Sequence, residues 1–229
     1  MTPSLILLSR KRCQLPPGHC LLTFDDGPSG AVTEELLLVL REFGVKACFC
    51  VVGSQVVARP EQTRAIAADG HLLVNHTFHH RFVDLWDIGR FESDLALCDD
   101  AVACATGEVP GSLPWFRPPF GIVTPPVREM ARRRRVLPIT HFAFDTWFNS
   151  TRTTLPSHWI IEDAKRSGGG IYVLHEGLVG GLTAGLLKRT PFRGWVPQAI
   201  KHILETLSAC GFQFPEPSAI LAKLDLSFH

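Results

Sequence analysis

The stretch Cys20-Leu-Leu-Thr-Phe-Asp-Asp-Gly-Pro28 joins a short apolar run to two adjacent carboxylates and a Gly-Pro turn. An apolar run of this length is typical of a buried strand, and the amphipathic pattern of residues 32–43 predicts a helix after it. Asp25 and Asp26 are therefore expected where a strand ends and the connection to a helix begins. Asp-Asp-Gly alone is also a common turn, so its place after a strand carries the argument.

The alternation of short apolar runs with longer amphipathic segments continues along the chain. We expect further strands at residues 46–52, 72–75, 113–116, 136–144, 171–175 and 212–214. We expect further helices at residues 59–69, 87–105, 126–135, 156–166 and 196–209. This order argues for an α/β fold with a parallel sheet and helical crossovers, open or closed into a barrel. No internal repeat or linker divides the chain, so we expect a single domain over residues 1–229, with its core at about residues 18–215.

Composition limits the classes of function. With 229 residues, 45% hydrophobic and 20% charged, the chain can bury a sizeable core, which excludes a disordered or collagen-like protein. A formal net charge of +1 gives no field that would attract nucleic acid. The longest apolar stretch is far shorter than the ~18 residues of a membrane span. We therefore expect neither a nucleic-acid partner nor a membrane span.

Cysteine usage and the first residues bear on the compartment. The seven cysteines form no C-x-x-C pair, and we expect them to be reduced and structural. Arg10, Lys11 and Arg12 follow the first apolar residues, whereas a signal peptide has its basic residues in front. A cytoplasmic location is favoured, and secretion with the signal already removed is the alternative.

Ionisable side chains follow several of the expected strands. In parallel α/β folds, functional sites gather at the carboxyl ends of the strands. The groups at five separate strand ends are Asp25 with Asp26, His76 with His79 and His80, Arg117, Asp145, and His175. We expect them to converge on one rim of the sheet.

The histidines of residues 76–80 have the spacing H-x-x-x-H. One helical turn would place residues four apart on the same face, which suits two imidazoles on one metal ion. A histidine-rich surface loop is the alternative. Spacing leaves open which of the three histidines stays free, and His71 is a weaker fourth candidate.

Two further motifs are less specific. Arg117-Pro-Pro-Phe-Gly121 predicts a rigid loop behind an arginine, and alone it is an ordinary proline-rich turn. Three glycines at residues 168–170 precede a strand and follow a helix. A phosphate-binding loop has the opposite order, which excludes nucleotide binding of that kind. The arginines at residues 132–135 suit the solvated carboxyl end of a helix.

Taken in order, T-F-D-D-G-P at 23–28, H-T-x-x-H at 76–80, R-P-P-F at 117–120 and the strand ending in His175 resemble the polysaccharide deacetylase family with the NodB homology domain, carbohydrate esterase family four. The resemblance implies a distorted (β/α) barrel and a divalent metal, usually zinc, with cobalt, nickel or manganese as alternatives. It also implies hydrolytic removal of acetyl groups from amino sugars or, less often, from sugar esters.

The resemblance also implies roles for single residues. Asp25 resembles the general base, and Arg117 resembles the arginine that pairs with it. Asp26, His76 and His80 resemble the metal ligands.

The remaining roles come from the later motifs. Phe120 stands where a backbone N–H would hold the oxyanion, with Pro119 beside it as a substrate contact, and His175 resembles the general acid. The usual D-x-x-D-W motif reads Asp145-Thr-Trp147-Phe-Asn here. This departure leaves open which carboxylate orients His175. Asp145 would serve if its loop shifts, with Trp147 as a wall of the substrate groove.

Two other functions fit the same residues. One is a relative on the same barrel and metal that hydrolyses a C–N bond in a small amide or cyclic imide. The other is a catalytically weakened protein that only binds a glycan or a metal. The intact Asp25 and His175 argue against the second, because binding alone requires neither. Chitin oligomers, peptidoglycan, xylan esters and a glycolipid head group all remain open as the carbohydrate partner.

Tryptophans are the side chains best suited to stack on sugar rings. Trp86, Trp115, Trp147 and Trp195 are candidates if they are exposed, and buried packing is the default for each. The oligomeric state stays open.

Overall fold

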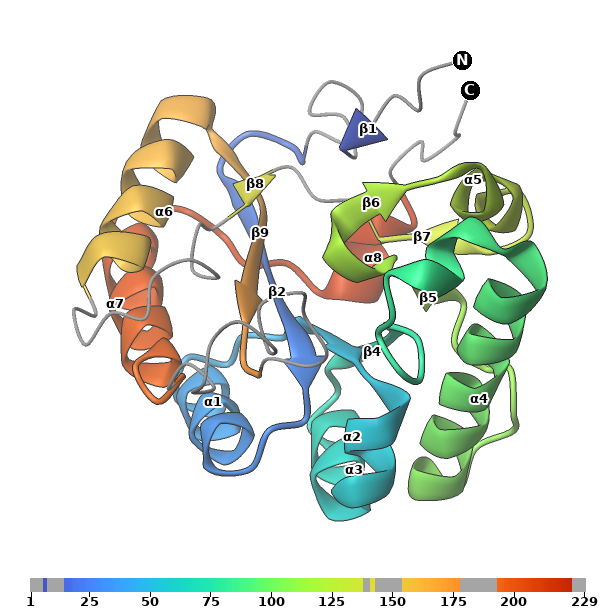
Figure 1. Cartoon of the computed structure of the whole chain (residues 1–229). Helices are drawn as coiled ribbons and strands as arrows, with labels where there is room; N and C mark the ends of the chain where they lie inside the picture. Colours follow the sequence, from blue (N-terminus) through green and yellow to red (C-terminus); the bar gives the residue numbers. More distant parts are fainter. Residues whose placement is uncertain (1–5, 8–14, 138–140, 143–153, 178–192, 224–229) are drawn as a thin grey trace.

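The main sheet of the protein is curled, and every hydrogen-bonded pair of neighbouring strands in it runs parallel (Figure 1). The computed structural model describes residues 6–7, 15–137, 141–142, 154–177 and 193–223. The strand order is β7-β5-β4-β3-β2-β9-β8. The strands are β2 (His19–Gly27), β3 (Cys48–Val51), β4 (Leu72–Asn75), β5 (Trp115–Phe116), β7 (Arg135–Val136), β8 (His141–Phe142) and β9 (Gly169–His175). A separate antiparallel pair is formed by β1 (Ile6–Leu7) and β6 (Ile122–Val123).

Helices lie around the outside of this sheet (Figure 1). The α-helices are α1 (Ala31–Glu42), α2 (Gly53–Ala58), α3 (Pro60–Ala68), α4 (Ile88–Thr106), α5 (Pro125–Ala131), α6 (Thr154–Ser167), α7 (Val196–Ala209) and α8 (Pro217–Leu221). Two 3-10 helices, η1 (Val83–Trp86) and η2 (Pro119–Gly121), lie in the connections near β4 and β5.

The curl of the sheet follows from its topology. The edge strands β7 and β8 are consecutive in the chain, with four residues between Val136 and His141. Six flat inter-strand spacings would separate the two edges by about 29 Å. Five residue steps reach only about 18 Å. The sheet must therefore bend toward closure, and the prediction of a distorted (β/α) barrel is confirmed.

The prediction of a single strand at residues 136–144 is wrong. Its residues contribute to two short strands, β7 and β8, on opposite edges of the sheet. Pro138 lies between them and has no N–H to donate to a strand ladder. The strand expected at 212–214 is reduced to one bridge between Gln213 and His19.

Two helices occupy the connection in which one, at residues 59–69, was expected. The additional helix α2 precedes α3, and Arg59 between them has a non-helical backbone, with φ −141° and ψ 60°. Pro60 then opens α3, a position that tolerates the missing N–H of proline. The helix expected at 126–135 ends already at Ala131, because Arg135 joins the sheet in β7.

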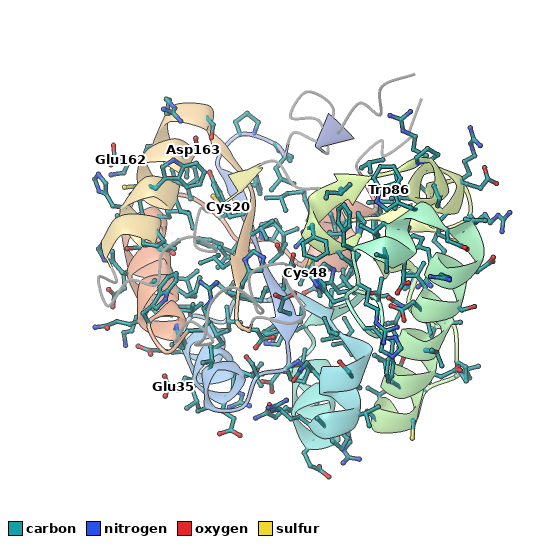
Figure 2. The ribbon with its side chains drawn as sticks, viewed as in Figure 1. Cys20, Glu35, Cys48, Trp86, Glu162 and Asp163 are labelled. Atoms are coloured by element: carbon teal, nitrogen blue, oxygen red, sulfur yellow. The ribbon has the colours of Figure 1, made fainter. Side chains whose placement is uncertain are left out.

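The interior is apolar and includes most of the described cysteines. Cys20, Cys48, Cys50 and Cys98 are buried and unpaired, and Figure 2 shows Cys20 and Cys48 among the strands. Burial raises the pKa of Cys20 and of Cys48 to about 12, so both thiols stay protonated near neutral pH. These cysteines therefore act as small core residues.

Among the helices of the described residues, none has the length and hydropathy needed to cross a membrane.

Candidate active site

Four strands deliver ionisable side chains to the carboxyl-terminal rim of the sheet. Asp25 and Asp26 lie near the end of β2, and His76 follows β4 directly. Arg117 follows β5, and His175 is the last residue of β9. The parallel arrangement explains why residues from 25 to 175 meet at one place.

The end of β2 is irregular, and this irregularity shapes the site. The pairing of β2 with β3 shifts register between Asp25 and Gly27, and Asp26 has a φ of 71°. In a regular strand, adjacent side chains point to opposite faces. Here Asp25 Oδ2 lies 3.8 Å and Asp26 Oδ1 lies 3.6 Å from the same atom, His76 Nε2. The bulge therefore brings both carboxylates to one imidazole.

Asp26, His76 and His80 form a buried cluster with one ligand atom each. Asp26 Oδ1 lies 3.6 Å from His76 Nε2 and 3.4 Å from His80 Nε2, and all three ligand atoms lie within 4.8 Å of one another. Ligands around a tetrahedral ion with bonds of about 2.0–2.1 Å stand roughly 3.3 Å apart. The donor set and its spacing fit a divalent metal such as zinc.

The segment that carries the two histidines is a turn, which corrects the helical expectation. Thr77 and His80 both have positive φ values, 65° and 54°. Thr77 N–H donates to Asn75 Oδ1 at 2.8 Å, and His80 N–H donates to Thr77 Oγ1 at 3.1 Å. Local hydrogen bonds to side chains therefore replace the helical ones and still bring His76 and His80 together.

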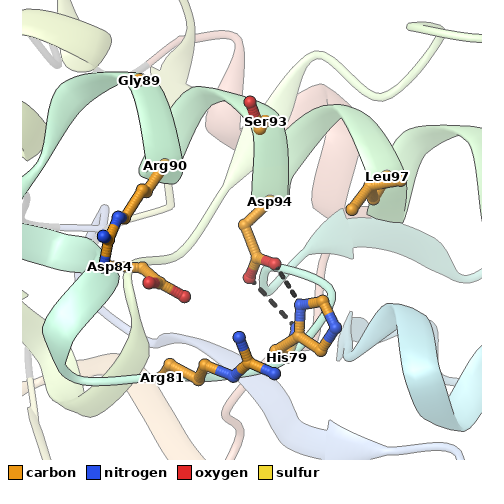
Figure 3. A pocket seen from close by; sticks show the side chains of 8 residues that line it. All are labelled: His79, Arg81, Asp84, Gly89, Arg90, Ser93, Asp94 and Leu97. Atoms are coloured by element: carbon orange, nitrogen blue, oxygen red, sulfur yellow. Dashed lines mark hydrogen bonds and ion pairs between the residues drawn. The ribbon is translucent and has the colours of Figure 1, made fainter.

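Asp94 of α4 stabilises the same turn from outside. Its Oδ2 accepts the N–H groups of Phe78 at 3.1 Å and of His79 at 3.0 Å. Its Oδ1 lies 2.5 Å from Nδ1 of His79, and Figure 3 shows this carboxylate directed at the imidazole. His79 is thus the histidine that stays outside the cluster. The buried Asp94 was missed from sequence, although a carboxylate on the buried side of the predicted helix was a visible signal.

His71, the weaker candidate, lies at the opposite end of β4. Its Nδ1 accepts the N–H of Ala47 at 3.2 Å, and its ring packs against Phe49 with centroids 5.1 Å apart. Burial lowers its pKa to about 4. It is a neutral core histidine.

His76 is held in the tautomer that a metal ligand needs. Its Nδ1 lies 2.8 Å from the carbonyl oxygen of Arg117. A carbonyl only accepts, so Nδ1 carries the hydrogen and Nε2 keeps a lone pair toward Asp26 and His80. Burial lowers the pKa of His76 to about 4, which keeps the ring neutral.

Asp25 is paired with the fully buried Arg117. Arg117 Nη1 donates to Asp25 Oδ1 at 2.5 Å and to Thr23 Oγ1 at 2.8 Å. Burial alone would raise the pKa of Asp25, but the Arg117 guanidinium holds it below its usual range. Asp25 is therefore an ionised carboxylate beside the cluster.

His175 lies beside Asp25 on the neighbouring strand. The two residues are Cα partners in the parallel pairing of β2 with β9, and His175 is partly exposed. Parallel strands lie about 4.8 Å apart. His175 is thus the backbone neighbour of Asp25 at the same rim of the sheet.

The carboxyl group of Glu176 lies buried behind the site, and the sequence did not reveal its burial. Its Oε2 accepts from Thr33 Oγ1, its carbonyl accepts from Ser29 Oγ at 2.6 Å, and its N–H donates to Asp25 O at 3.1 Å. Its Oε1 has no hydrogen-bond partner among the described residues. Burial raises its pKa to about 8.

The Arg117-Pro-Pro-Phe-Gly loop forms the wall next to His80. Pro119 is buried, and Phe120 has a φ of 60°. The Phe120 ring packs against His80 with centroids 4.6 Å apart. The role expected for the Phe120 N–H stays a prediction. Asp145 and Trp147 lie outside the described residues.

Comparison with known proteins identifies relatives of this chain. The family model described as polysaccharide deacetylase matches residues 13–136. A chitooligosaccharide deacetylase of Bradyrhizobium sp. (strain ANU 289) is 28% identical over 195 residues, 84% of this chain and 85% of the relative. A peptidoglycan-N-acetylglucosamine deacetylase of Bacillus cereus is 29% identical over 203 residues, 87% of this chain and 86% of the relative.

Other matches are shorter or structural. A chitooligosaccharide deacetylase of Rhizobium leguminosarum bv. trifolii is 39% identical over 88 residues, 38% of this chain and 41% of that relative. A solved structure, a family 4 carbohydrate esterase from Streptomyces lividans in complex with acetate, superposes with a TM-score of 0.66 at 25% identity. The match covers 87% of this chain and 91% of that one.

Proposed function

The chain belongs to the polysaccharide deacetylase family, and from that premise we propose that it is a metal-dependent hydrolase that removes acetyl groups from N-acetylated sugars. The relatives that it resembles along most of its length are named for chitooligosaccharide and for peptidoglycan N-acetylglucosamine. The observation that carries the proposal is the Asp26, His76 and His80 cluster beside a separately held, ionised Asp25.

The three clustered residues would hold the metal. Two imidazole nitrogens and one carboxylate oxygen are donors that zinc prefers, and cobalt, nickel and manganese are alternatives. When bound, a divalent ion lowers the pKa of water and polarises a carbonyl oxygen. The neutral state of His76 supports its role as a ligand.

Asp25 would act as the general base. Its carboxylate is held ionised and aimed by Arg117, which leaves Oδ2 next to the cluster. As a water oxygen attacks the acetyl carbon, Asp25 takes the proton that the water loses. The backbone N–H of Phe120 would donate to the oxygen that gains negative charge.

His175 would act as the general acid. An amine is a poor leaving group unless it is protonated. His175 would give a proton to the sugar nitrogen as the C–N bond breaks, which yields acetate and a free amino sugar. Its place beside Asp25 on the neighbouring strand supports this division of labour.

Acetate release from N-acetylglucosamine oligomers, with and without added zinc, tests the proposal. Asp25→Asn is expected to keep its metal, because Asp25 is not one of the three clustered ligands, and to lose about 10²–10⁴-fold in turnover. His80→Asn is expected to lose bound metal as measured by elemental analysis. His79→Asn is the matched control, since His79 lies in the same turn and outside the cluster.

Near-normal acetate release by Asp25→Asn would contradict the assignment of the base. Equal metal content in His80→Asn and His79→Asn would contradict the ligand set. Hydrolysis of a small amide without acetate release from oligomers would point to the C–N hydrolase instead.

A further inference from the structure

Exposed apolar side chains gather on one short segment beside the site. Eight large apolar side chains are exposed in the described part of the chain, and four of them belong to residues 82–88. They are Phe82, Val83, Trp86 and Ile88. Trp86 is 45% and Phe82 is 37% exposed, whereas Trp115 and Trp195 are buried. Among the tryptophans considered from sequence, Trp86 is thus the one that the structure describes as exposed (Figure 2).

The segment that presents these rings is firmly attached to the fold. Leu85 of η1 is fully buried and packs in one cluster with Phe91 and Phe116. The carbonyl of Leu85 accepts a hydrogen bond from Oγ1 of Thr124, the residue that caps α5. The rings on η1 therefore stand on a fixed base, which lowers the entropic cost of binding a ligand.

A continuous series of ring contacts joins this segment to the metal cluster. The Phe120 ring packs on His80 with centroids 4.6 Å apart, and Phe82 packs on Phe120 at 6.0 Å. Trp86 packs near Phe82 at 6.3 Å. A molecule that extends from the site along this series would meet aromatic rings as it leaves.

We propose, on the basis of the proposed function, that Phe82 and Trp86 form a subsite that stacks on a neighbouring sugar ring of a glycan chain whose acetylated residue lies at the metal cluster. The substrate is then an oligomer or polymer. A small amide would fill the site and leave this surface unused.

The chemistry of the surface favours a neutral sugar ring. The four exposed side chains carry no charge, and the C–H face of a pyranose packs well on an aromatic ring. Arg81, Asp84 and Arg90 line a hollow together with His79 and Asp94 (Figure 3).

Chain-length dependence tests the subsite. Michaelis constants are measured for N-acetylglucosamine itself, which has no neighbouring sugar ring, and for its hexasaccharide with the metal-loaded protein. Trp86→Ala is expected to raise the KM for the hexasaccharide about ten-fold, with kcat and the monosaccharide KM little changed. Trp86→Phe should keep most of the hexasaccharide affinity. Val109→Ala, which removes an exposed apolar side chain elsewhere, is the matched control.

An equal rise in KM for both substrates, or no rise for the hexasaccharide, overturns the subsite. Calorimetric binding of the hexasaccharide to Asp25→Asn, with and without Trp86→Ala, gives a readout that needs no turnover. Binding that depends on Trp86 without acetate release by the wild type would refute the proposed function and support the subsite. Acetate release by the wild type with no effect of Trp86→Ala would support the proposed function and refute the subsite. Self-association that depends on Trp86, with unchanged KM values, would assign the surface to a second copy and overturn the subsite.

Discussion

The ion pair between Asp25 and Arg117 allows a double-mutant test of the site. Arg117→Met keeps a long apolar side chain and removes the guanidinium that donates to Asp25 and to Thr23. The Asp25 carboxylate then stays buried without its main compensating charge. Asp25→Asn removes the charge from the other partner and leaves the Arg117 cation fully buried.

The structure sets the magnitude. Removing one partner of a buried ion pair costs about 3–5 kcal/mol of unfolding free energy, because the remaining charge loses compensation. The double variant leaves neither charge behind. We therefore expect it to be less destabilised than the sum of the two single variants, by about 2–3 kcal/mol.

Urea unfolding of metal-free protein, followed by tryptophan fluorescence at neutral pH, measures these differences. Arg41→Met is the control, because the Arg41 and Asp69 pair is at the surface and its loss should cost below about 1 kcal/mol. The reasoning is refuted if the two substitutions at the site add within ~0.5 kcal/mol, or if Arg117→Met costs no more than Arg41→Met.

The same substitution has a kinetic consequence. Without the guanidinium, the pKa of Asp25 rises, because burial then dominates. A general base works in its ionised form. The acid limb of the pH–activity profile is therefore expected to move to higher pH in Arg117→Met, and an unmoved limb would contradict the role of Asp25.

Two further predictions concern the buried carboxyl group of Glu176. Burial raises its pKa from 4.5 to about 8, so the folded, metal-free protein holds this proton more tightly than the unfolded chain. The stabilisation that comes from this one proton is fully present below about pH 4.5 and is lost as the pH rises toward 8, by no more than about 5 kcal/mol. Glu176→Gln should remove this part of the pH dependence of urea unfolding, and an identical pH dependence in both proteins would contradict it. A Cβ on Gly27 would lie 1.6 Å from Glu176 Oε1, so Gly27→Ala is expected to cost about 1–3 kcal/mol. Gly89→Ala on α4 is the control, because a Cβ there would lie 3.5 Å from Asp87 Oδ1, an ordinary contact distance. Full stability of Gly27→Ala would show that the Glu176 side chain moves freely.

Periodicity predicted most of the fold because it is a local property of the chain. A strand buried on both faces must be apolar throughout, and a helix that covers it must be apolar on one side, whatever the distant sequence is. The ends of β2, β4 and β9, at Gly27, Asn75 and His175, were therefore predictable within about one or two residues. Their convergence followed from the parallel order.

The errors occur where distant contacts decide the local structure. Residues 136–144 are apolar enough for one strand, but the sheet needs β7 and β8 on opposite edges. The H-x-x-x-H spacing suggested two histidines on one helical face, but Thr77 and His80 adopt positive φ in a turn, and it is this turn that brings His76 and His80 together. The choice against His79 depends on Asp94, which lies fifteen residues away and carries no sign of its partner in the sequence.

Burial of charge was the least predictable property, and it decides the chemistry of the site. Arg117 compensates Asp25, and burial keeps His76 and Glu176 uncharged near neutral pH. The Asp26 carboxylate is then the negative group at the centre of the cluster, with two imidazole nitrogens within 3.6 Å of its Oδ1. A divalent cation among these three donors would add a positive charge beside the buried carboxylate. Burial thus keeps His76 and Glu176 uncharged, while Arg117 keeps Asp25 ionised beside the cluster. The resulting arrangement matches the needs of a metal ion.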